Sequence, residues 1–103
     1  MISKKMADAL NQQMNEEFYN ARLYLSMATY FYSINLEGAA HWMEKQAEEE
    51  TGHAMRLYKH LNERGARITV GAVTAPPAQW ASPLAAYEDA DKNECSVTTA
   101  FDA

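Results

Sequence analysis

Residues 43–61 read MEKQAEEETGHAMRLYKHL, and apolar side chains recur through this stretch at alternating steps of four and three. Because each residue of an α-helix turns by about 100°, these steps place the side chains on one face of a helix. The face consists of Met43, Ala47, Glu50, Ala54, Leu57 and Leu61. One acid therefore occupies a core-facing position, and His53 lies at the edge of the same face.

An upstream segment has the same arrangement, with a stripe made of Leu10, Met14, Glu17, Ala21, Tyr24, Ala28 and Phe31. An ionised carboxylate without a partner in a protein interior costs several kcal/mol, and neither stripe contains Lys or Arg. A divalent cation held by Glu17, Glu50 and His53 would supply the missing charge, since Glu-x-x-His on a helix directs both side chains to one point. The alternative is a solvated edge glutamate and a hydrogen-bonded histidine.

The run Glu48-Glu49-Glu50 cannot face the core as a whole. Consecutive helical residues diverge by about 100°, so Glu48 is expected to face solvent. Glu49 is intermediate, and two interpretations remain open: a solvated rim residue or an outer cation-binding carboxylate.

The chain is predicted to be all-α. A helix over 3–33 lacks Pro and Gly, a break follows at 35–38, and a second helix over 37–64 ends before Gly65, a preferred C-terminal cap. Residues 66–81 contain Pro76-Pro77 and form an extended connection. A connection of this length fits a crossover that gives the third helix the same direction as the second.

Ser82-Pro83 is an N-cap followed by Pro at the first helical position, so the third helix is predicted over 83–103. Its stripe also has an acid in the middle, which makes Glu94 another candidate ligand; the other members are Tyr87, Ala90, Val97 and Phe101. The expected architecture is two long antiparallel helices, a long crossover and a short third helix, within one domain over 1–103.

Composition restricts the function classes. The net charge of −5 and the pI near 5.1 disfavour a nucleic-acid surface, which needs clustered Lys and Arg. The single cysteine, Cys95, cannot form an internal disulfide, and no secretory leader pattern is present, so we expect a cytoplasmic protein. No apolar run approaches the ~18 residues that span a bilayer, so no membrane partner is expected.

Three runs resemble the non-haem bacterial ferritins: EFYNARLYL at 17–25, NLEGAAHW at 35–42 and QAEEETGHAMR at 46–56. Pro76-Pro77, Ser82-Pro83-Leu84 and Glu94 match as well, and the resemblance extends over 1–103. It implies a ferritin-like helix bundle of which the chain contains the part through the start of the third helix. The family continues with the rest of that helix, a fourth helix with further ligands and a short fifth.

The resemblance also implies roles for individual residues. Glu17 and His53 would bind a first iron, Glu50 would bridge two irons, and Glu94 would belong to the second. Glu49 matches a carboxylate that helps to form a third, outer iron site in bacterial members. Tyr24 matches a tyrosine beside the site that donates hydrogen bonds or electrons; its alternative role is core packing.

The expected function is that of an iron-storage ferroxidase, which oxidises Fe²⁺ with O₂ and passes Fe³⁺ to a mineral. The family implies a homo-oligomer, a cage of 24 chains. Haem is not expected, because Thr51 follows the bridging glutamate where haem-binding relatives have Met.

A second hypothesis is a truncated, self-associating subunit with an incomplete, inactive metal site. A peroxidase of the rubrerythrin kind is disfavoured because the chain has no Cys-x-x-Cys module. Asp91 departs from the family pattern, which has an apolar residue there; it is an extra ligand, a rim residue or a destabilising change.

Overall fold

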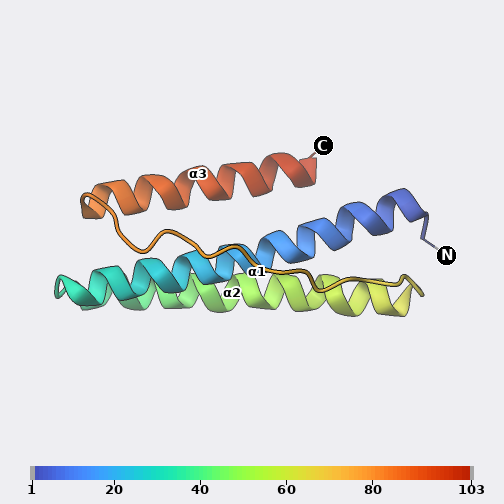
Figure 1. Cartoon of the computed structure of the whole chain (residues 1–103), viewed down its shortest axis with the longest axis horizontal. Coiled ribbons are helices and arrows are strands. Elements are labelled where there is room, and N and C mark those ends of the chain that lie inside the picture. Colours follow the sequence, from blue (N-terminus) through green and yellow to red (C-terminus); the bar gives the residue numbers. More distant parts are fainter. Residues whose placement is uncertain (1, 103) are drawn as a thin grey trace.

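The computed structural model describes the backbone of residues 2–102 and the side chains of residues 2–93. Three helices form the described part of the chain: α1 (Lys4–Ser33), α2 (Glu37–Glu63) and α3 (Pro83–Asp102). They lie nearly parallel to one long axis, in a rod of 49 × 21 × 20 Å (Figure 1). The prediction of an all-α helix bundle is confirmed.

Local capping determines where α1 begins and ends. The Ser3 hydroxyl accepts a hydrogen bond from the Met6 N–H at 3.2 Å, so Ser3 lies just outside the helix that was predicted to include it. At the other end Asn35 adopts the left-handed conformation, with φ of 63°. The Leu36 N–H then donates to the Phe31 carbonyl at 2.9 Å, which satisfies a helix-end acceptor and turns the chain into α2.

The same motif ends α2. Gly65 has φ of 75°, and the Ala66 N–H donates to the Leu61 carbonyl at 3.0 Å. Arg64, predicted as the last helical residue, is instead the C-cap. The helix thus stops where the sequence offers a residue without a Cβ.

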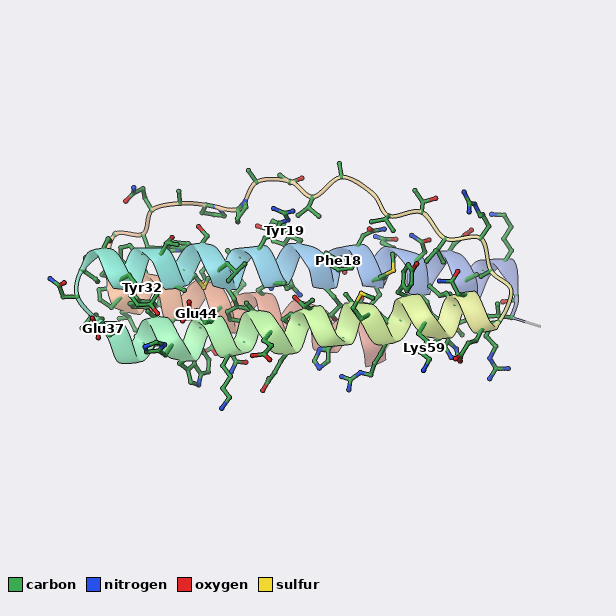
Figure 2. The ribbon with its side chains drawn as sticks, turned by 90° about the horizontal axis from the view of Figure 1, so that it is seen from below. Phe18, Tyr19, Tyr32, Glu37, Glu44 and Lys59 are labelled. Carbon is green, nitrogen blue, oxygen red and sulfur yellow. The ribbon has the colours of Figure 1, made fainter. Side chains whose placement is uncertain are left out.

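The connection between α2 and α3 returns along α1, so α3 runs in the same direction as α2 (Figure 1). Figure 2 shows it on the side of α1 that faces away from α2. Two α1 amides hold it there: Asn11 exchanges two hydrogen bonds with the Thr69 backbone, and Asn15 accepts from the Gly71 N–H at 2.9 Å. The Ser82 hydroxyl then caps α3 by accepting from the Ala85 N–H at 3.1 Å.

The main hydrophobic cluster lies between the helices in the half of the rod near the α1–α2 turn, and Met14, Ala54 and Leu61 are buried in the other half. The buried members of the cluster are Leu23, Tyr24, Met27, Ala28, Phe31, Ala40, Met43, Ala47, Ala86 and Ala90. Alanines such as Ala28, Ala40 and Ala47 let α1 and α2 pack closely, while α3 lies further away and adds Ala86 and Ala90 to this cluster. Over the part of the chain that is described, no helix is both long and apolar enough to cross a membrane.

Candidate metal centre

Glu17 of α1 converges with Glu50 and His53 of α2. Each of the three offers one ligand atom, and these atoms lie within 4.8 Å of one another. His53 Nδ1 is 3.6 Å from Glu17 Oε2 and 3.8 Å from Glu50 Oε2. The antiparallel packing of two helices therefore brings together residues that are 33 and 36 positions apart in the sequence.

The two acids are buried while the histidine is partly open to solvent. The exposed fractions of the side chains are 0% for Glu17, 6% for Glu50 and 45% for His53. Two carboxylates in a low-dielectric site favour a cation, because a protonated His53 would offset only one of the two negative charges. The donor set of carboxylate oxygens and one imidazole nitrogen suits a divalent transition metal such as iron or zinc.

Glu17 has distinct roles for its two carboxylate oxygens. Oε1 accepts a hydrogen bond from Gln13 Nε2 at 2.9 Å, within a buried environment. Oε2 has no hydrogen-bond partner among the described residues, and it is the oxygen nearest His53. An orphaned buried oxygen beside an imidazole is the arrangement that a metal ion would complete, so the site fits a metal on its own chemistry.

Gln13 was missed in the sequence. It lies four residues before Glu17, where side chains on a helix meet, and a Gln-x-x-x-Glu pair within an apolar stripe was the available signal. The hydrogen bond orients Glu17 and leaves Oε2 directed toward His53, which is the usual way in which an outer residue positions a metal ligand.

The other predicted residues lie in different environments. Tyr24 is 2% exposed and belongs to the core, two helical turns along α1 from Glu17. Glu49 and Asp91 are exposed, as is Glu48, which was expected to face solvent. The side chain of Glu94 lies outside the described residues.

A buried amide pair joins α1 to α3 close to the centre. Asn20 is 2% exposed, and its Oδ1 accepts a hydrogen bond from Asn93 Nδ2 at 2.6 Å. Asn20 lies one turn beyond Glu17 on α1, so this contact places the neighbourhood of Asn93 beside the same section of α1. The pair was not predicted, because its members are 73 residues apart.

Comparison with known proteins agrees with this architecture. The sequence model of the ferritin-like domain family matches residues 7–103 of this chain. A bacterial non-heme ferritin from Bacteroides fragilis is 38% identical over 103 residues, which are 100% of this chain and 65% of that protein. The chain belongs to the ferritin family, as the resemblance in its sequence predicted.

Solved ferritin structures superpose closely. An open pore ferritin from the archaeon Archaeoglobus fulgidus has a TM-score of 0.94 and 50% identity, covering 97% of this chain and 62% of its own. The ferritin of Chlorobium tepidum has a TM-score of 0.95 and 34% identity, covering 99% and 63%. The chain thus spans less than two thirds of the length of these relatives.

Proposed function

We propose that this chain provides part of a ferroxidase centre for iron storage, in which Fe²⁺ is oxidised with O₂ and the Fe³⁺ product passes to a mineral. The observation that carries the proposal is the convergence of Glu17, Glu50 and His53 within 4.8 Å in a chain of the ferritin family. Residues 1–103 would form one part of a single ferritin-like domain.

In this proposal iron is the substrate, and different side chains bind different iron ions. Glu17 Oε2 and His53 bind the first Fe²⁺, and Glu50, between the two ions, bridges them. Glu94 belongs to the second ion. Glu49, exposed beside Glu50 on α2, contributes to an outer third site.

The donor set favours oxidation. Anionic carboxylates stabilise Fe³⁺ more than Fe²⁺, which lowers the reduction potential of the bound ion and favours electron release. Two Fe²⁺ ions held in one site supply two electrons, enough to reduce one O₂ to hydrogen peroxide when two protons come from water. Holding both ions within reach of one O₂ replaces a rare encounter of three reactants with a prearranged one.

The positions of Glu94 and Tyr24 in the proposal have indirect support. The hydrogen bond between Asn20 and Asn93 holds α3 beside α1 one turn from Glu17, and Glu94 follows Asn93 directly. Tyr24 is buried on the same stripe of α1 as Glu17. We assign it the role of a hydrogen-bonding and electron-donating residue at the site.

The test is iron oxidation by the apoprotein. The protein is mixed anaerobically with Fe²⁺, air is admitted, and Fe³⁺ formation is followed by absorbance. We expect oxidation faster than in protein-free buffer, with a large loss in Glu17→Ala and in His53→Ala. His60→Ala is the matched control, because His60 is an exposed histidine two turns further along α2. Oxidation no faster than in buffer would remove the ferroxidase proposal for this chain.

A specific observation favours self-association as well. Several large apolar side chains on the three helices are exposed: Leu25, Trp42, Met55, Leu84 and Tyr87. Burial of such groups against other copies would be favourable, and we propose a homo-oligomer, with the family's cage of 24 as the largest form. Mass measurement in solution tests this. An oligomer that oxidises no iron would favour the inactive, self-associating subunit.

A further inference from the structure

A second group of potential metal ligands lies at the turn end of the α1–α2 hairpin, in the half of the rod that contains the main hydrophobic cluster. Tyr32, in the last turn of α1, donates a hydrogen bond from its hydroxyl to Glu44 Oε1 at 2.8 Å. His41 Nδ1 is 3.2 Å from the same oxygen and 3.4 Å from the Tyr32 hydroxyl. Figure 2 shows Tyr32 at this end of the hairpin, with Glu37 and Glu44 close by.

The spacing of the three donor atoms matches a coordination sphere. Ligands about 2.0–2.1 Å from one metal ion are about 2.9 Å apart in octahedral geometry and about 3.3 Å apart in tetrahedral geometry. The triangle formed by Tyr32 Oη, His41 Nδ1 and Glu44 Oε1 has edges of 2.8, 3.2 and 3.4 Å. One ion can therefore contact all three atoms without a large movement of either helix.

The surroundings carry negative charge. Glu37 lies one turn before His41 on α2, and its charge, together with that of Glu44, adds to the hydrogen bond that raises the pKa of the Tyr32 phenol. The positive N-terminal end of α2 opposes a cation, but the negative C-terminal end of α1 lies beside it and partly cancels that effect. The local balance of formal charge is negative.

We propose that Tyr32, His41 and Glu44 bind a borderline divalent transition-metal ion, Cu²⁺ or Zn²⁺, in an open site separate from the Glu17–Glu50–His53 centre. Imidazole with oxygen donors suits these ions, and solvent can fill the remaining coordination positions, because the His41 and Glu44 side chains are 69% and 44% exposed. The ion takes the place of the phenol proton, which is released to solvent as the phenolate becomes a ligand.

Because the ligands come from two helices, the bound ion links the end of α1 to the start of α2. Metal binding to the folded hairpin and not to the unfolded chain raises the unfolding temperature. The bound ion would thus stabilise the turn between α1 and α2, and this stabilisation can be measured without any iron oxidation assay.

The test uses Cu²⁺ as the probe, since it forms the tightest complexes of the first-row divalent ions and has an electron paramagnetic resonance signal. The His53→Gln protein, which lacks the imidazole of the buried centre, is titrated with Cu²⁺. We expect one equivalent with an imidazole nitrogen in the spectrum and a visible phenolate-to-copper band. Tyr32→Phe should abolish the band, and His41→Gln should weaken binding at least tenfold.

The matched control is His60→Gln in the same background, which removes an exposed histidine of the same helix and should change neither affinity nor spectrum. Circular dichroism checks that each variant is folded. Zn²⁺ should raise the unfolding temperature of the His53→Gln protein and should not raise that of the same protein carrying His41→Gln. Two results would overturn the proposal: equal Cu²⁺ binding by the variants with His41→Gln and His60→Gln, or the absence of a phenolate band in the His53→Gln protein. Tyr32, His41 and Glu44 would then be only a hydrogen-bonded cluster on the surface.

Discussion

Replacing Glu17 with a neutral side chain distinguishes its role in metal binding from its effect on the stability of the metal-free protein. Its side chain is fully buried, and the ligand atoms of Glu17 and Glu50 lie within 4.8 Å. The substitution Glu17→Gln keeps the shape of the side chain and an acceptor for Gln13, and it removes one buried negative charge. We expect the metal-free variant to be more stable than the parent protein.

The magnitude follows from Coulomb's law. Two negative charges 4.8 Å apart repel each other by about 3.5 kcal/mol at an effective dielectric constant of about 20. Solvent that reaches the site past His53, whose side chain is 45% exposed, screens part of this repulsion. We expect a net gain of about 2 kcal/mol in the free energy of unfolding, equivalent to roughly 10 °C in Tm for a chain of this size.

The assay is thermal and urea denaturation of the metal-free proteins at one fixed protein concentration, repeated anaerobically with Fe²⁺. Fe²⁺ should stabilise the parent protein and have little effect on Glu17→Gln. Glu16→Gln is the control, since it removes the same charge from an exposed position and should change stability by less than about 0.5 kcal/mol. A metal-free Glu17→Gln protein less stable than the parent, or one equally stabilised by Fe²⁺, would refute the reasoning.

Three further predictions concern single contacts. Gln13→Leu removes the hydrogen bond that orients the buried carboxylate ligand and should weaken Fe²⁺ binding by about tenfold or more in an anaerobic titration. Asn35 has φ of 63°, a conformation that asparagine tolerates because its short polar side chain can hydrogen-bond locally. Asn35→Ala should therefore lower the free energy of unfolding in urea by about 1 kcal/mol, whereas Asn35→Gly should not. The pKa of Tyr32 is raised above its ordinary value of 10.0 by the hydrogen bond to Glu44. A group whose pKa is raised by folding adds stability below its unfolded pKa and loses it as the pH rises through the folded value. Glu44→Gln should therefore lower the pKa of Tyr32 in a phenol absorbance titration and reduce the loss of stability as the pH rises above 10.0.

The helix ends were predictable because they depend on local chemistry. Gly65 and the Ser82-Pro83 pair act through their own backbone and side-chain geometry, and the structure places a left-handed cap and an N-cap there. The turn at Asn35 was expected only as a break. Its left-handed conformation is one that asparagine tolerates better than most residues, but the sequence does not state which residue of the break adopts it.

The sequence predicted on which helix face each site residue lies, but it did not predict the distances between residues on different helices. Periodicity placed Glu17 and Glu50 on apolar stripes, but their approach depends on how far α1 slides along α2. That register follows from the turn at 34–36 and the close packing of alanines such as Ala28, Ala40 and Ala47. Contacts between elements far apart in the chain, such as Asn20 with Asn93, left no signal in a single sequence.

The amino-acid order by itself determined the number and length of the helices, the face of each that is apolar and the acids that interrupt those faces, because these properties arise within a few helical turns. Tertiary structure alone decided that Oε2 of Glu17 faces His53, whereas the hydrogen bond from Gln13 to Oε1 is a contact within α1. It also decided that Tyr32, His41 and Glu44 meet at the turn. Such distances depend on how separate helices pack together, and the free energy of that packing is shared by contacts along the whole rod.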